Sequence, residues 1–182
     1  MAKIGLKNFR YSPLDENDEV TGAKQLGKAI DCKVAIEKNE AELHADDGLA
    51  ESDYSFKKGT VTLGIDEDDD TTFAEILGHK ISEDGELVRN AEDIPPYVAM
   101  NRILTKMVNG VRKYKVEHLS KVKFKEPDAD EKTQGKDLEF GTNSIEGAVH
   151  KKSNGEWSKA KTFETYAEAE AYATELLTPA KV

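Results

Sequence analysis

Residues 111–125 read VRKYKVEHLSKVKFK, where apolar and charged side chains alternate more regularly than anywhere else in the chain. A strand that is buried on one face shows this period of two, because successive side chains point to opposite sides of the sheet. Asn109-Gly110 stands directly before the run, and an Asn-Gly pair between two strand-like segments favours a β-hairpin. The face predicted to be buried carries Tyr114, Val116, His118, Ser120, Val122 and Phe124.

Other segments show the same period. The hairpin partner is predicted over residues 97–107, which follow Pro95-Pro96. A further strand pair is expected over residues 138–151 and 156–161, with its turn at 153–155 and a bulge or bend near 141–144. Two shorter strands are predicted to bury Ile30, Cys32, Val34 and Ile36, and Val61, Leu63 and Ile65.

Two helices and one long connection complete the expected architecture. Thr72 and Glu75 form a capping-box pattern that predicts a short helix over residues 73–78, ending at Gly78. Thr165 and Glu168 form a second one, which opens a C-terminal helical segment over residues 162–178. Residues 38–59 are expected to be a long inter-strand loop, and loops of that length are usually functional or disordered.

The composition restricts the classes of protein that the chain can belong to. Its 182 residues are 34% charged, with a net charge of −10, and they predict a single domain over residues 1–182. An acidic chain is a poor nucleic-acid binder, since tight binding needs lysines and arginines that neutralise phosphates. No apolar run predicts a transmembrane helix or a secretory signal, and Cys32, the only cysteine, cannot form an intramolecular disulfide.

No pattern of catalytic residues is recognisable, so the chain is not expected to be an enzyme or to hold a cofactor. Residues 66–70 lack the Gly and Glu that a calcium loop needs at its sixth and twelfth positions, and are better explained as an acidic approach to a helix. Asp46 and Asp47 beside His44 are better explained as a solvated turn. His118, Cys32 and Trp157 are expected to be packing residues.

Two charged segments have opposite signs. Residues 111–125 carry six basic side chains and Glu117, a segment charge of +5, whereas residues 66–70 carry −5. They could meet between subunits and fix the register of an assembly, or the lysines could form a solvated face that discourages aggregation. The sequence leaves both interpretations open. The patch candidates are Asp66, Glu67, Asp68, Asp69, Asp70, Lys113, Lys115, Lys121, Lys123 and Lys125.

Several short motifs occur in an order that resembles a known family. The motifs are Gly5-Leu-Lys-Asn8, Ala45-Asp-Asp-Gly48, Glu75-Ile-Leu-Gly-His79, Leu87-Val-Arg-Asn90, Pro96-Tyr-Val-Ala99 and Lys123-Phe-Lys-Glu-Pro127. With these motifs the sequence resembles, over about residues 4–147, the major tail proteins, or tail tube proteins, of long non-contractile-tailed bacteriophages and prophages of Gram-positive bacteria.

The resemblance implies a mainly β fold, a β-sandwich or half-barrel with a short flanking helix, to which the second capping box adds a C-terminal helix. It implies stacked six-fold rings that form the tail tube, through which the genome passes on its way into the host. The implied partners are further copies of the chain and the tape measure, tail terminator and distal tail proteins, with DNA passing unbound and no membrane. The implied location is the virion tail, after assembly in the host cytoplasm.

In this family the long loop reaches the next ring, which makes the loop of this chain a candidate inter-subunit contact. The residues carried over are Ala45, Asp46, Asp47, Gly48, Ala50 and Glu51. The alternative is a monomeric β-sandwich binding module for a carbohydrate or a protein, and a metal-dependent hydrolase at residues 66–70 is the third and weakest hypothesis. A binding module would expose a concave aromatic patch, whereas only 7% of this chain is aromatic.

Overall fold

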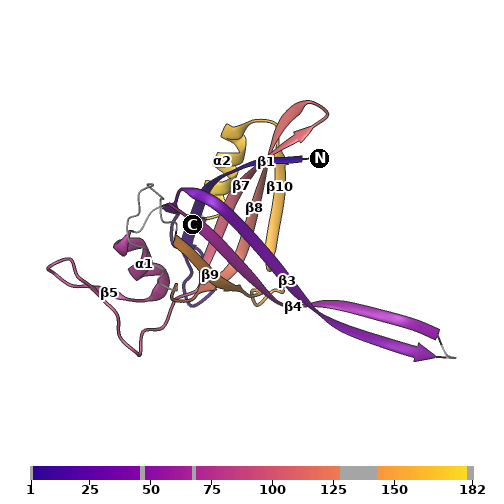
Figure 1. Ribbon diagram of the computed structural model, residues 1–182, viewed down its shortest axis with the longest axis horizontal. Coiled ribbons are helices and arrows are strands. Elements are labelled where there is room, and N and C mark those ends of the chain that lie inside the picture. The colour runs from indigo at the N-terminus through magenta and orange to yellow at the C-terminus, as the bar shows by residue number, and fades with distance from the viewer. Residues whose placement is uncertain (1, 46–47, 67–68, 128–142, 180–182) are drawn as a thin grey trace, which may run out of the picture.

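The computed structural model of the chain describes residues 2–45, 48–66, 69–127 and 143–179, with the backbone alone at residues 2, 40–45, 48–53 and 143. The fold is mainly β with two helices, as the sequence predicts (Figure 1). One antiparallel sheet runs in the order β2-β1-β7-β8-β9-β4-β3, and β10 also pairs with β8. Its strands are β1 (Ala2–Pro13), β2 (Lys24–Gly27), β3 (Ala29–Ala45), β4 (Gly48–Ile65), β7 (Val98–Val108), β8 (Val111–Phe124), β9 (Asn143–Val149) and β10 (Ser158–Phe163).

The β7–β8 hairpin confirms the prediction from Asn109-Gly110. Both residues have positive φ values, 50° and 80°, which match a two-residue turn whose twist suits the flanking strands. Beyond the turn, β8 divides the sheet into two branches. Its first half, up to Leu119, pairs with β10, whereas Val122–Phe124 pairs with β9.

The residues predicted to be buried from Val116 to Phe124 are buried, but the prediction that they share one face is wrong. Val98 is opposite Val122 but Met100 is opposite Leu119, so β8 holds an extra residue at this point. Such a bulge reverses the alternation, because every later side chain moves to the other face. Val116 therefore packs beneath the C-terminal helix, whereas Leu119, Val122 and Phe124 belong to the main core.

The main core lies between the two branches of the sheet. Phe9 and Tyr11 of β1 face Val61 and Leu63 of β4, and all four are at most 1% exposed. Helix α1 (Asp70–Leu77) adds buried apolar side chains to this core. The second core is smaller and lies under helix α2 (Tyr166–Glu175), with Ile103, Val116, Ala169 and Ala173 fully buried.

Both helices begin with side-chain caps, but only one cap is where the sequence predicts it. Thr165 and Glu168 form the expected capping box of α2. The cap of α1 is Asp69 rather than Thr72, because the Asp69 carboxylate accepts hydrogen bonds from the backbone N–H groups of Thr71 and Thr72. The helix therefore starts one turn earlier than predicted, and it ends at Gly78 in the left-handed conformation.

The expected loop over residues 38–59 is instead a continuation of the sheet. Strands β3 and β4 pair from Ala29–Ile65 out to Ala45–Gly48, and the outer part of this hairpin extends from the body (Figure 1). We call residues 38–56 the arm. Its sequence has no continuous apolar face, because the arm does not pack on the core and needs none.

Two further predictions about strands are wrong. Residues 143–149 and 158–163 do not pair with each other: β9 pairs with β4 and β8, whereas β10 pairs with β8. The turn at 153–155 reverses the chain, but the division of β8 sends the two strands to different neighbours. Ile30, predicted to be buried, is 46% exposed at the free side of β3. The bend expected near residues 141–144 lies largely outside the described residues.

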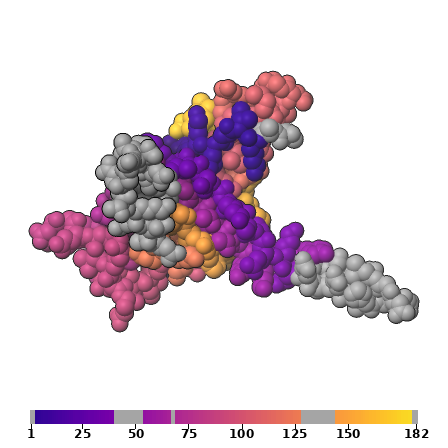
Figure 2. All heavy atoms as spheres, viewed as in Figure 1, coloured from indigo at the N-terminus to yellow at the C-terminus, as the bar shows by residue number. Residues whose placement is uncertain are grey.

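A small two-stranded excursion leaves the body between α1 and β7. Strands β5 (Lys80–Ile81) and β6 (Leu87–Val88) pair only with each other. Figure 2 shows this excursion projecting from one side of the molecule, and Figure 1 shows the arm extending from the opposite side. Ile81, Val88 and Ile94 are exposed on the excursion, at 41%, 39% and 74%.

Candidate assembly surfaces

The predicted inter-subunit residues lie at the outer end of the arm. Ala45 pairs with Gly48 there, Ala50 and Glu51 follow on β4, and Asp46 and Asp47 lie outside the described residues. Near the body, the Phe56 ring stacks on Trp157 with centroids 5.2 Å apart, and Asn39 Nδ2 donates to Ser55 Oγ at 3.2 Å. The structure thus places the described candidates far from the core, on a hairpin whose base is fixed by these contacts.

The acidic run serves the start of α1. Asp69 caps the helix, and hydrogen bonds from Thr72 lower the pKa of its carboxyl, so that it is ionised. Asp70 lies in the first turn, where a negative charge favours the helix dipole. Asp66 pairs with Lys28 at 3.5 Å, whereas Glu67 and Asp68 lie outside the described residues. The described residues of the acidic run therefore act near the start of α1, in agreement with their interpretation as an acidic approach to a helix.

The five patch lysines are engaged within the chain. Four form ion pairs, and Lys123 lies over the Tyr97 ring with its Nζ 5.3 Å from the centroid. In the part of the chain that the structure describes, none of these partners belongs to the acidic run. The ion pairs are Lys113–Glu164 at 2.7 Å, Lys115–Glu117 at 2.6 Å, Lys121–Asp18 at 2.6 Å and Lys125–Glu146 at 2.9 Å.

A groove of about 660 Å³ lies where β1 and β3 approach each other over β7, β8 and β10. Arg102 lines it and is 7% exposed, and its Nη2 donates to Glu117 Oε2. Lys115 Nζ donates to the other oxygen of Glu117 at 2.6 Å, and these cations keep the pKa of Glu117 low despite its burial. The alternation of residues 97–107 predicts a buried strand but gives no sign of this buried guanidinium.

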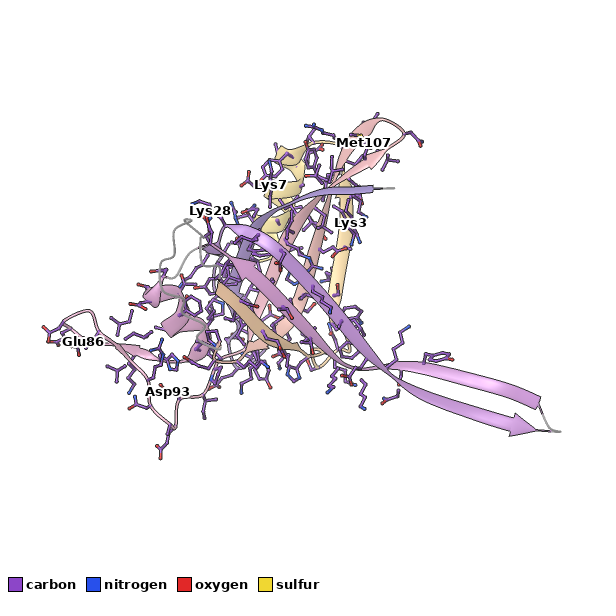
Figure 3. All side chains as sticks on the ribbon, in the orientation of Figure 1. Lys3, Lys7, Lys28, Glu86, Asp93 and Met107 are labelled. Carbon is purple, nitrogen blue, oxygen red and sulfur yellow. The ribbon has the colours of Figure 1, made fainter. Side chains whose placement is uncertain are left out.

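A histidine joins the excursion to the end of β8. His79 Nδ1 lies 2.8 Å from Asp93 Oδ2, and its Nε2 lies 2.8 Å from Glu126 Oε2. Burial lowers the pKa of His79, but the two carboxylates outweigh it and raise the pKa overall. Only an imidazolium can donate to both carboxylates at once, so the geometry favours the charged ring. Figure 3 labels Asp93 on this segment.

A second cavity of about 820 Å³ lies between α2 and residues 152–159. His118 lines it, is 5% exposed, and has an Nδ1 atom without a hydrogen-bond partner among the described residues. Burial, with a contribution from Lys159, lowers the pKa of His118 to about 4, so the ring is neutral. Its position under α2 agrees with the prediction of a packed histidine.

Two searches for other kinds of site gave no candidate. Across the described residues, no three His, Cys, Asp or Glu side chains come together in a group that could hold a metal ion. No helix in the same residues is long and apolar enough to cross a membrane. These findings concern the described part of the chain alone.

Comparisons with known proteins give only distant likenesses, and these are to solved structures. No family model matches the sequence, and no curated protein matches it. Among solved structures, the fold is similar to the tube-terminating cap of the anti-feeding prophage, determined by cryo-electron microscopy. The alignment has a TM-score of 0.46 and 10% sequence identity, and it covers 90% of this chain and 93% of that chain. A likeness this distant leaves the function to be argued from the residues of the chain itself.

Proposed function

We propose that the chain is a non-enzymatic structural subunit of a phage-type tail tube, which assembles into stacked six-fold rings. The order of the sequence motifs supports this proposal, as does the mainly β fold that the resemblance implies. The observation that carries it is the arm, a paired hairpin that extends beyond the core of its own chain (Figure 1). Such a hairpin gains packing partners when other copies surround it.

The proposal includes partners and a location. Further copies of the chain supply the ring and stacking contacts, and tape measure, tail terminator and distal tail proteins meet the tube at its ends or lumen. DNA passes through without specific binding, which suits a chain with a net charge of −10. The protein is made in the host cytoplasm and resides in the virion tail.

Mass measurement by light scattering, with negative-stain imaging of the same sample, tests this function. We expect rings or tubes with a central hole, formed by the chain alone or after seeding with purified tail initiator complexes. A chain that stays monomeric after seeding contradicts the proposal. That outcome favours a monomeric binding module, for which the cavity of about 820 Å³ beside His118 is the candidate site.

A further inference from the structure

We propose that the groove between β1 and β3 receives the arm of a second copy, with an arm carboxylate accepting hydrogen bonds from Arg102. This inference rests on the self-assembly proposed above and names the surface that the arm contacts. It assigns a role to a buried cation and to two free strand edges.

Arg102 is the first part of the argument. Its side chain is 9% exposed and one nitrogen, Nη2, donates to Glu117, but Nη1 is buried without a hydrogen-bond partner in the described part of the chain. A charged donor that is buried and unpaired is costly, so an acceptor from outside would satisfy it. A carboxylate suits a guanidinium best, because the two groups form charge-assisted hydrogen bonds.

The charge of the groove favours an acidic occupant. Lys3, Arg102 and Lys115 line it against two carboxylates, Asp31 and Glu117, which leaves one positive charge in excess. Glu117 is shared by Arg102 and Lys115, whereas Lys3 is exposed and forms no ion pair with a described residue (Figure 3). The groove is therefore locally cationic in a chain whose net charge is −10.

The walls of the groove suit an extended segment. In the described chain, residues 2–8 of β1 pair only with β7 on one side, and β3 pairs only with β4. The unpaired backbone groups on these edges can add a strand, and alternate side chains of that strand would enter the groove. The apolar lining includes Leu6, Ile30, Val34, Leu104, Leu119 and Trp157.

The arm is acidic and carries apolar side chains, so it is complementary to the cationic and partly apolar groove. Residues 38–56 contain six carboxylates and one lysine, Lys38 at the base, but no arginine, and Leu43 and Leu49 are interspersed among the carboxylates. The backbone of the arm is already extended, so little order must be imposed when it adds to a sheet. In Figure 1 the arm points away from its own body, and therefore from its own groove, so the occupant must come from a second copy.

Chemical cross-linking tests the contact, because Cys32 is the only cysteine and lines the groove. Leu43→Cys and Leu49→Cys each place one thiol on the arm, and a short bis-maleimide then links thiols that come close. We expect covalent dimers and longer chains for both variants. We expect none when Cys32→Ala is added, and far fewer for Val111→Cys, an exposed site on the β7–β8 turn.

A second pair of variants perturbs the groove from the other side. Ile30→Asp places a like charge where the acidic arm is expected, at a side chain that is 46% exposed. We expect it to lower the yield of arm–groove cross-links about tenfold or more, because like charges across an interface are strongly unfavourable. Ile81→Asp, at 41% exposure on the excursion, is the matched control and should leave the yield unchanged.

The outcomes separate this inference from the proposed function, because rings are counted by negative stain in the same samples. Rings without arm–groove cross-links, or cross-links that Ile30→Asp does not reduce, overturn the inference and leave the assembly intact. Absent rings after seeding overturn the proposed function, whatever the cross-links show.

Arg102→Gln, judged only if its melting temperature stays near that of the parent chain, should reduce the cross-links as Ile30→Asp does.

Discussion

Gly78 is the residue whose backbone leaves least room for change. It ends α1 with φ of 78°, and a Cβ atom there would collide with the carbonyl oxygen of Ile94. Both the left-handed conformation and the close contact oppose any side chain. We expect Gly78→Ala to lower the free energy of unfolding by about 2–4 kcal/mol, measured by urea denaturation.

Gly85 provides the control for Gly78. Its φ is 85°, but a Cβ atom there meets nothing within 4 Å. Gly85→Ala therefore bears only the conformational cost, about 1 kcal/mol. Equal losses for the two variants would show that the contact with Ile94 does not matter.

His79 makes a pH-dependent contribution to stability. Its pKa in the folded chain is raised above the unfolded value of about 6.5 by Asp93 and Glu126, despite opposing burial. A side chain whose pKa is raised on folding stabilises the fold at pH values below its pKa in the unfolded chain. This stabilisation is lost as the pH rises through its pKa in the folded chain. We expect the melting temperature of the parent chain to fall by roughly 2–4 °C more than that of His79→Gln between pH 6 and pH 9.

The comparison with His79→Gln is needed because other groups titrate in the same range. Arg89 pairs with Glu126 at 3.0 Å and keeps that carboxylate near the ring at every pH in the experiment. The difference between the two melting curves therefore reports His79. A difference that does not change with pH would contradict the charged ring between two carboxylates.

Local signals in the sequence predict local features well. Asn109-Gly110 predicts the β7–β8 hairpin, and Thr165 with Glu168 predicts the cap of α2. Each of these features depends on residues only a few positions apart. The burial of Arg102 is different, since its partner Glu117 lies on the neighbouring strand and the groove also needs β1 and β3. No local pattern in residues 97–107 contains that information.

The arm is the element to which the proposed function assigns the contacts between subunits. Deletion of residues 41–52, with Asn-Gly as the new turn, removes no residue of either hydrophobic core. We expect the melting temperature to change by less than about 3 °C, since the core is intact. Rings and tubes, counted by negative stain after seeding, should be lost or reduced to unstacked rings.

A deletion in the excursion is the control for the deletion in the arm. The excursion also projects from the body, and replacement of residues 82–86 by Asn-Gly shortens its turn without touching the core. Normal tubes from the shortened arm would contradict its role in assembly. Loss of tubes from both deletions would point to a general defect in the subunit rather than to the arm.

Strand pairing shows why elements are harder to predict than turns. Residues 38–56 alternate too weakly to predict strands, because both faces of the arm lie outside the core. The bulge in β8 and the division of the sheet between β9 and β10 depend on which neighbours reach each half of the strand. These are properties of the assembled sheet, so the period of each segment predicts its type but not its partner.

At the scale of the whole molecule, the net charge of −10 would govern what the proposed tube carries. A lumen that attracted phosphates would slow the passage of DNA, whereas a negative wall repels them. We expect acidic side chains to outnumber basic ones on the lumen wall of an assembled tube. A cryo-electron microscopy map at side-chain resolution measures this, and a wall lined mainly by lysine would contradict it.

The isolated subunit gives a simpler test of the same electrostatics. The lysines of β8 form ion pairs or ring contacts within the chain, so few of their charges are free to displace counterions from DNA. We expect no retardation of a short duplex in a gel-shift assay at low salt. If retardation does occur, falls steeply with added salt and disappears in Lys121→Glu with Lys123→Glu, then β8 binds DNA. The passage of the genome through such a tube would then need a different physical account, in which lysine–phosphate contacts are made and broken along the wall.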